Sequence, residues 1–269
     1  MRRIIMFALL ICIANQKLFA QELYVFTEPA SNMPAKSLAI RFTNEGMFRN
    51  GLQTRTIPEL MVGLNKNIMF HIQGFSSNMD GKYKVEGASL YAKYRFLSVD
   101  GEQSHIRAAL YGRISSSNRS TFTEDINLEG DVAGWQGGAV FTQLLHKLAL
   151  SATLGYSKSF SRDDKQVINS PVPNEMLNYS LSSGYLLLPF VYKNYKQPNF
   201  NLYVELLGKT NPANGHSYLD FAPAVQLIIN SKTRIDLGYR FQAAGDMDNR
   251  YLKDMYLARV EFNFFNVLK

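Results

Sequence analysis

A strict alternation of apolar and small or polar residues in the stretch 147–155, KLALSATLG, constrains the fold more than any other feature. Every second residue from Leu148 to Leu154 is apolar. Because successive side chains of a β-strand point to opposite faces, one face of this strand is apolar and the other polar. In a soluble sheet the apolar face would meet a core, whereas in a membrane barrel it meets lipid. The pattern recurs about a dozen times, so it predicts a transmembrane β-barrel in an outer membrane.

Residues 1–20 predict a cleaved secretory signal peptide. Two arginines precede an apolar run over residues 4–14, which is too short to cross a bilayer as a helix, and Ala20 ends a plausible cleavage site. The only cysteine, Cys12, lies inside this segment. The mature chain therefore has no thiol for disulfides, thiolate catalysis or Cys-ligated metals.

Charge and composition limit the possible partners. The formal net charge is +7, and Arg2, Arg3 and Lys17 of the signal supply three of these charges. The remainder is too weak to indicate nucleic-acid binding. No later stretch approaches the roughly 18 apolar residues that a helical membrane span needs. An exported chain without such helices belongs to the periplasm, the outside medium or the outer membrane.

The mature chain is expected to begin with a periplasmic lead-in, residues 21–35. Pro29 and Pro34 forbid a central strand there, because proline cannot donate to a strand ladder. The alternative is a small plug, with Tyr24 and Phe26 against the periplasmic mouth of the barrel.

Residues 36–269 are expected to form one all-β domain, a single antiparallel transmembrane barrel of about twelve strands. A ten-strand barrel is possible if the first or sixth strand is misread. A soluble β-sandwich is the competing fold, but it gives no reason for connection lengths to alternate. The expected strands cover residues 37–43, 56–65, 68–76, 86–96, 105–115, 131–144, 147–160, 179–190, 200–208, 218–229, 234–242 and 255–265.

The connections between these strands alternate in length. Tight links fall at residues 65–67, 146–147 and 230–232, whereas the longest covers residues 161–178. Short turns at one end and long loops at the other are typical of outer-membrane barrels. With an even number of strands, both termini are expected on the short-turn side, which faces the periplasm.

Five stretches carry a resemblance to a known group. They are YVFTEPASNMPAKS (24–37), PELMVGLNKNIMFH (58–71), LYAKYRFLSVDG (90–101), LDFAPAVQLIINSKTRIDLGYR (219–240) and VEFNFFNVLK (260–269). Together they resemble outer-membrane β-barrel proteins of Bacteroidetes-type bacteria, a group loosely labelled as transporters. The resemblance implies the barrel, the outer-membrane location and recognition by the outer-membrane assembly machinery.

Catalytic and metal-binding patterns are weak. A histidine and a serine two residues apart on one strand face could form a nucleophilic pair. His71, His105 and His146 lack such a serine, and the side chains of His216 and Ser217 would point to opposite faces. Four scattered histidines and no mature cysteine give no metal-ligand spacing. The sequence thus predicts no enzyme, no cofactor and no metal site.

Charged residues on the polar strand faces are the candidate site. Arg or Lys on the lipid face near mid-bilayer costs about 2–4 kcal/mol, so these residues are expected inside the barrel or at its rims. If they pair across a narrow interior, the barrel is closed; if they line a water path, they select solutes. The expected lumen-lining residues are Arg41, Glu59, Lys93, Arg95, Arg107, Arg113, Glu205, Asp220, Asp236, Arg240, Arg259 and Glu261.

This set contains seven basic and five acidic residues. Arg259 and Glu261 share a face and are expected to pair. The basic residues of strands 86–96 and 105–115 (Lys93, Arg95, Arg107, Arg113) have no acidic neighbour in the expected register. The surplus predicts a mildly basic lumen that weakly prefers anions.

The expected function is a narrow channel or transporter for small solutes. The alternative is a closed structural or surface-interaction barrel that acts through its outer loops. The expected partners are outer-membrane lipid, the assembly machinery and an unidentified small solute, with no nucleic acid.

Overall fold

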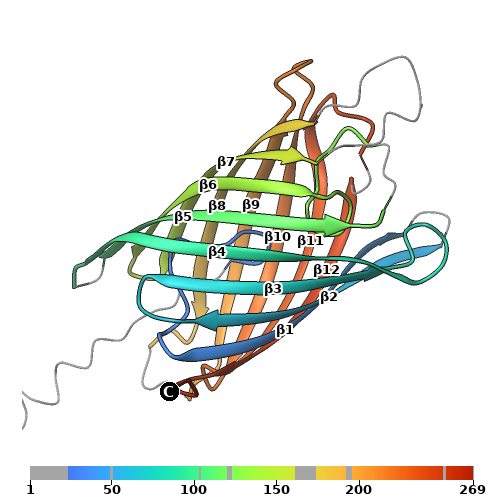
Figure 1. Ribbon diagram of the computed structural model, residues 1–269. Helices are drawn as coiled ribbons and strands as arrows, with labels where there is room; N and C mark the ends of the chain where they lie inside the picture. The colour runs from blue at the N-terminus through green and yellow to red at the C-terminus, as the bar shows by residue number, and fades with distance from the viewer. Residues whose placement is uncertain are drawn as a thin grey trace, which may run out of the picture.

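The computed structural model describes residues 24–48, 51–102, 104–119, 123–160, 174–191, 196–250 and 253–268. Within these ranges the chain forms a closed barrel of twelve antiparallel strands (Figure 1). Each strand pairs with its neighbours in sequence, and β1 pairs with β12, so the barrel has no free edge. The predicted all-β, twelve-stranded barrel is confirmed. The strands are β1 (Ser37–Phe48), β2 (Leu52–Gly63), β3 (Ile68–Ser77), β4 (Lys84–Asp100), β5 (Ser104–Ser117), β6 (Gly134–Leu145), β7 (Leu148–Ser159), β8 (Glu175–Leu188), β9 (Asn199–Thr210), β10 (Ser217–Ile229), β11 (Thr233–Gly245) and β12 (Asp254–Phe264).

Several strands are longer than the sequence pattern predicts. The clearest case is the hairpin of β1 and β2, which continues until Phe48 pairs with Leu52. Polar side chains support this extension, because Asn44 Nδ2 donates to Thr54 Oγ1 at 2.8 Å. The apolar alternation ends where a strand leaves the lipid zone, whereas backbone pairing continues. The sequence pattern therefore marks the lipid-facing part of each strand better than its ends.

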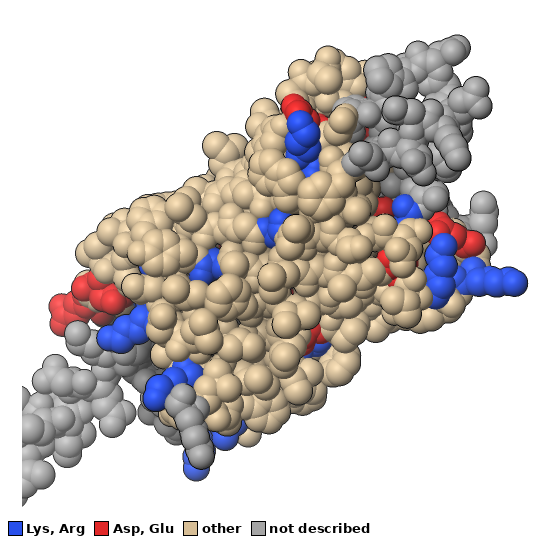
Figure 2. Space-filling view, viewed as in Figure 1, with Lys and Arg blue, Asp and Glu red and all other residues tan. Residues whose placement is uncertain are grey.

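The outer surface of the barrel is apolar. On β7 and β8, Leu154 and Leu181 are 65% and 60% exposed, whereas Ala149 and Ser151 on the opposite face are buried. Figure 2 shows charged side chains mainly near the two ends of the visible face, with only small charged patches among the uncharged residues of its middle. A closed barrel satisfies its backbone hydrogen bonds between strands, as a membrane interior requires. The architecture and the apolar exterior are those of an outer-membrane β-barrel.

Because aromatic residues favour the membrane–water interfaces, the strand pattern predicts six of them on the lipid-facing side near strand ends: Tyr94, Phe96, Tyr156, Tyr239, Phe241 and Phe264. Tyr156 is half-buried and the other five are exposed, which supports the assigned strand faces. The described part of the chain contains no helix that is long and apolar enough to cross a membrane.

Both described ends of the chain lie at the end of the barrel that carries the short turns. The amide of Val267 donates to the carbonyl of Lys36 at 3.0 Å, which brings the start of β1 next to the chain after β12. Asn32 Nδ2 donates to the carbonyl of Lys66 in the β2–β3 turn at 3.4 Å. The predicted signal peptide, residues 1–20, and residues 161–173 of the predicted link 161–178 lie outside the described residues.

Two segments that are not barrel strands fill much of the interior. One is the N-terminal segment, residues 24–34, which contacts the walls at the short-turn end. The other is the inner loop, residues 123–133 between β5 and β6, at the long-loop end. In Figure 1 the N-terminal segment runs through the space enclosed by the strands. The two segments determine what space remains inside.

Candidate functional site

A cavity of about 250 Å³ remains between the N-terminal segment and the inner loop. Residues from each of the twelve described strands line this central cavity, together with parts of both segments. Its lining is rich in charge and also contains tyrosines, including Tyr91 and Tyr111. The acidic, basic and histidine residues of the lining are Glu28, Arg41, Glu45, Glu59, His71, Arg113, Glu129, Lys209, Arg240 and Arg259.

Arg41 on β1 holds three carboxylates at one side of the cavity. Its guanidinium donates to Glu261 at 2.8 Å, to Glu28 at 3.0 Å and to Glu59 at 3.2 Å. A guanidinium has five donors in a rigid fork, so it can satisfy several acids at once. Burial alone would raise the pKa of Glu28, but the positive charges of Arg41 and Lys93 lower that pKa to about 2. Glu28 therefore stays ionised inside the barrel.

An aromatic row crosses the neighbouring wall. The rings of His71 and Tyr91 lie 4.9 Å apart, and those of Tyr91 and Tyr111 stack at 5.8 Å. His71 Nδ1 lies 2.6 Å from Glu59. The hydroxyl of Tyr111 lies close to the backbone of β6 and β7, since a Cβ at Gly138 or Gly155 would meet it at 2.7 or 2.3 Å. The absence of a side chain at these glycines therefore leaves room for the Tyr111 hydroxyl.

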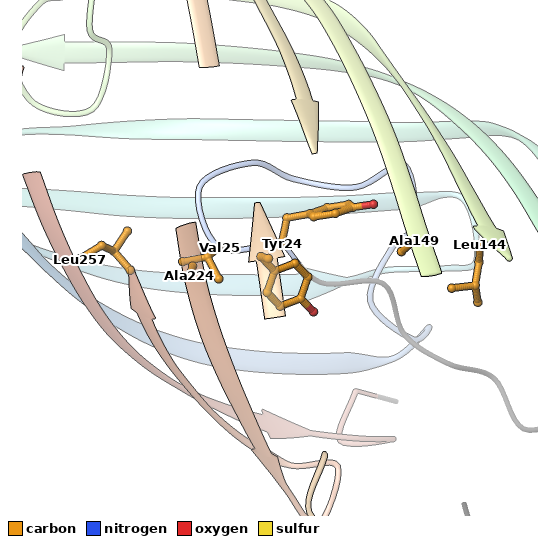
Figure 3. Close-up of a cluster of buried hydrophobic side chains, with 7 residues drawn as sticks. Tyr24, Val25, Leu144, Ala149, Ala224 and Leu257 are labelled. Carbon is orange, nitrogen blue, oxygen red and sulfur yellow. The ribbon is translucent and has the colours of Figure 1, made fainter. Parts of the chain in front are cut away.

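The N-terminal segment is held at the short-turn end by charged wall residues. Glu205 accepts from the amides of Val25 and Phe26 at 2.9 and 2.8 Å. Lys93 Nζ donates to the carbonyls of Pro29 and Ser31. Figure 3 shows Tyr24 and Val25 among apolar side chains that come from separate strands, including Leu144, Ala149, Ala224 and Leu257.

The inner loop is held at the other end by a buried ion-pair network. Asp131 accepts hydrogen bonds from Arg55 of β2 and from Arg119. Arg55 also donates to Glu86 of β4 at 2.8 Å. Gly130 has φ +103°, and a side chain there would meet Arg55 Nε and Glu86 Oε2 at 2.8 Å. The loop thus enters the barrel where only glycine fits.

The inner loop also contributes acidic side chains to the lumen, and its apolar side chains form part of a buried cluster. Glu129 accepts from Arg113 at 2.5 Å, and Asp125 accepts from Lys209 at 2.8 Å. Burial would raise the pKa of both carboxyls, but the facing cations lower it. The apolar side chains of the loop pack with strands and with the β11–β12 connection in one cluster: Ile126, Leu128, Val132, Met176, Tyr218 and Met247.

The charged residues proposed from sequence as lumen-lining differ in burial and in partners. Arg95, Arg113, Arg240 and Arg259 are half-buried. The other eight are buried: Arg41, Glu59, Lys93, Arg107, Glu205, Asp220, Asp236 and Glu261. Arg41, Glu59 and Glu261 come together in one cluster. A second cluster joins Asp220 to Arg240 and to Arg250, each at 2.5 Å. Lys93, Arg107 and Glu205 contact the N-terminal segment.

The predicted pair of Arg259 with Glu261 is wrong. Arg259 Nη1 lies 3.6 Å from Asp236 and donates to the carbonyl of Val25 at 2.7 Å. Glu261 instead pairs with Arg41 and, at 3.6 Å, with Arg234. Residues two apart on one strand face compete with cross-strand neighbours, which here lie closer.

The prediction that four basic residues lack acidic neighbours is also wrong for three of them. Arg113 pairs with Glu129 of the inner loop, and Lys93 lies 3.8 Å from Glu28 of the N-terminal segment. Arg107 pairs with Asp100 at 3.2 Å. Two of these acids come from segments outside the strands, so strand register alone could not place them.

Sequence reasoning missed several interior charges. Arg55, Glu86, Arg119 and Asp131 form the network around the inner loop, and all are buried. Arg234 was also missing from the predicted set. The sequence could have indicated it, because Arg234 lies two residues before Asp236 and therefore shares its strand face. Its guanidinium pairs with Asp236 at 2.8 Å. The described residues hold no group of three or more His, Cys, Asp or Glu side chains that could bind a metal ion.

No protein-family model and no curated protein sequence matches this chain. Solved structures of outer-membrane channels have the same fold. The COG4313 outer membrane channel from Pseudomonas putida F1 aligns with a TM-score of 0.54 and 12% identity over 90% of this chain and all of the other. The NanC porin aligns with a TM-score of 0.51 and 11% identity over 84% and 98% of the two chains. The KdgM porin aligns with a TM-score of 0.50 and 11% identity over 84% and 99%. The chain therefore has a fold shared with outer-membrane channels.

Proposed function

We propose that the protein is a narrow outer-membrane channel for small solutes and that the central cavity is the middle of its path. The observation that supports this most directly is a cavity of about 250 Å³ with charged residues in its lining, to which all twelve described strands contribute. The N-terminal segment lies on the short-turn side of the cavity and the inner loop on the long-loop side, and neither segment is part of the barrel strands. Movement of such segments can open a path while the barrel keeps its strand pairing.

The size and charge of the cavity limit the solute. Ligand pockets for drug-sized molecules have volumes of roughly 300–1,000 Å³, so a cavity of about 250 Å³ fits smaller ones. The lining includes five basic residues (Arg41, Arg113, Lys209, Arg240, Arg259) and four acidic ones (Glu28, Glu45, Glu59, Glu129). A small, hydrophilic and charged solute suits this lining. A barrel of the same fold, KdgM porin, has been solved in complex with disordered oligogalacturonate.

A tryptophan substitution on the inner face of one strand, compared with a tryptophan on the outer face of the same strand, tests the path. Thr153 of β7 lines the cavity, whereas the side chain of its neighbour Ala152 is exposed on the outer face. Thr153→Trp should lower the single-channel conductance of the purified mature protein in planar bilayers and slow solute entry into liposomes. Ala152→Trp should change neither. Equal conductance in the two folded variants would contradict a path through this cavity.

A closed barrel that acts through its outer loops is the second candidate. The buried network of Arg55, Arg119 and Asp131 favours it, because it fixes the inner loop inside the barrel. This candidate predicts a folded, inserted protein without conductance, even after the inner loop is released.

The orientation is part of the proposal. We infer that the short-turn end, with both termini of the mature chain, faces the periplasm and that residues 21–35 enter from that side. A protease site inserted at Asn214, in the β9–β10 loop, should be cut in intact cells, and one at Lys66, in the β2–β3 turn, should not. We further propose that the protein is related to the Bacteroidetes-type outer-membrane barrels. We also propose that the outer-membrane assembly machinery inserts it.

A further inference from the structure

The short-turn end of the barrel interior contains a site that holds a bent stretch of peptide. The N-terminal segment occupies it, and its backbone makes most of the polar contacts with the wall. Tyr24, Val25 and Ala30 are almost completely buried there. The segment joins β1 through Lys36, whose φ is +57°. The wall residues that contact the segment belong to several strands, so the site exists only in the folded barrel.

One buried carboxylate binds three consecutive residues of the segment. Glu205 accepts from the amides of Val25 and Phe26, and from Thr27 Oγ1 at 2.6 Å. Its fourth donor is Ser182 Oγ at 3.0 Å. Among the described residues Glu205 forms no ion pair within 4.0 Å, so the segment supplies most of its hydrogen bonds. A fully buried carboxylate needs such donors, because leaving it without them costs much free energy.

Basic side chains bind the carbonyls of the same segment. Arg234 donates to the carbonyl of Tyr24 at 2.5 Å, and Arg259 to that of Val25 at 2.7 Å. Lys93 binds two further carbonyls, those of Pro29 and Ser31, at 2.7 and 2.8 Å. Proline has no amide hydrogen, so its carbonyl is the only backbone group that a wall residue could bind. Basic side chains of the wall thus bind carbonyls of the segment, and one acidic side chain binds two of its amides.

Two glycines shape the wall to the segment. A side chain at Gly238 of β11 would meet the ring of Phe26 at 2.7 Å. A side chain at Gly63 of β2 would meet the carbonyl oxygen of Pro34 at 2.3 Å and Met33 at 2.7 Å. The wall is therefore hollowed near both ends of the segment.

We propose that this site is a peptide-binding site inside the barrel and that residues 24–34 are its resident, displaceable ligand. The proposal rests on the proposed channel function, since departure of the segment opens the short-turn end of the central cavity. The segment is joined to the barrel only through β1, and its polar contacts are non-covalent. It can therefore leave and return without breaking the strand pairing that closes the barrel.

Alanines at the two hollows test displacement. Gly63→Ala with Gly238→Ala should push the segment away from the wall and raise the single-channel conductance several-fold. Gly74→Ala with Gly112→Ala is the matched control, because side chains there meet only ordinary contacts at 3.6 and 3.8 Å. Both double variants should keep the heat-modifiable gel mobility of a folded barrel. Unchanged conductance in the first variant, together with a lower yield of the disulfide between Ala30→Cys and Ala109→Cys than in the otherwise wild-type chain, would contradict gating by the segment.

A reversible cross-link tests occupancy independently of conductance. Ala30 packs against Ala109 and Val140, and the mature chain has no cysteine of its own. In the otherwise wild-type chain, Ala30→Cys together with Ala109→Cys should form a disulfide, and Ala30→Cys alone should not. Added to the Gly63/Gly238 variant, the oxidised pair should restore low conductance, and a reducing agent should raise it again.

The two measurements separate the two proposals. A disulfide that forms in high yield, in a folded protein that conducts in no variant, would overturn the channel function and support the peptide site. No disulfide in the otherwise wild-type chain would overturn the peptide site, even if the protein conducts.

Discussion

At the scale of single residues, arginines organise the interior by binding several acids each. Arg41 contacts three carboxylates, and Arg55 contacts Glu45 at 3.5 Å as well as Glu86 and Asp131. Removing one partner of a buried ion pair is strongly destabilising, because the other charge stays buried without compensation. Substitutions in these clusters should therefore affect folding and gating together, which calls for controls that separate the two effects.

Glu28 gives the docked N-terminal segment a pH dependence. Burial raises its pKa, but Arg41 and Lys93 lower it from 4.5 to about 2. A carboxyl with a depressed pKa contributes stability that is present above its unfolded pKa and lost as the pH falls through its folded pKa. We therefore expect stable docking from pH 7 to about 5 and progressive release between about 4.5 and 2, seen as rising conductance. Glu28→Gln should lose this acid step; the same step in that variant would assign it to another carboxyl group.

Gly130 should be more sensitive to substitution than a glycine with similar backbone geometry. Gly130 and Gly51 have φ values of +103° and +111°, and only Gly130 faces neighbouring atoms within 4 Å. Either alanine pays a backbone strain of about 1–2 kcal/mol. Gly130→Ala should in addition displace Arg55 or Glu86 and lower the unfolding temperature further than Gly51→Ala. Thermal unfolding in detergent checks this. Equal decreases in the unfolding temperature of the two variants would show that the inner loop accommodates the added methyl group.

At the scale of elements, the strands could be predicted from sequence, and the two interior segments could not. Lipid on one side and polar groups on the other impose a period of two on each strand, as in 147–155. The N-terminal segment has no such period, and its contacts join distant residues: Val25 and Glu205 are 180 positions apart. A plug was an open alternative for Tyr24 and Phe26, but neither the backbone pattern of its contacts nor the pairing of Glu28 with Arg41 is visible in sequence.

The inner loop should be released by loss of one charge. Asp131 is buried and accepts hydrogen bonds from Arg55, Arg119 and Asn127. Asp131→Asn keeps the shape of the side chain but removes its charge, and breaking a buried pair in this way costs about 3 kcal/mol. We expect proteolysis within the loop and more frequent channel opening. Glu175→Gln, at an exposed ion pair with Lys158, should change neither; a protected loop in Asp131→Asn would mean that its apolar cluster suffices to hold it.

At the scale of the whole molecule, a closed barrel encloses two segments that lie outside its strand pairing. Strand pairing from β1 through β12 fixes the wall, whereas the inner loop and the N-terminal segment limit the path from opposite ends. The interior charges are shared between wall and segments, since Glu28 and Glu129 neutralise wall cations. Opening either end therefore changes the charge of the path as well as its width.

This coupling predicts a change of ion selectivity on opening. With both segments in place, five basic and four acidic side chains line the central cavity, so the wild-type channel should prefer anions only weakly. When the N-terminal segment leaves, Glu28 leaves with it, and Arg41 and Lys93 of the wall lose that partner. Inside a low-dielectric wall such a surplus is poorly screened. The Gly63/Gly238 variant should therefore show both a larger conductance and a stronger anion preference, measured as the reversal potential under a KCl gradient. Glu28→Gln should shift the reversal potential in the same direction with a smaller rise in conductance. A shift toward cations in the opened variant would mean that other interior acids, such as Glu59, control the path.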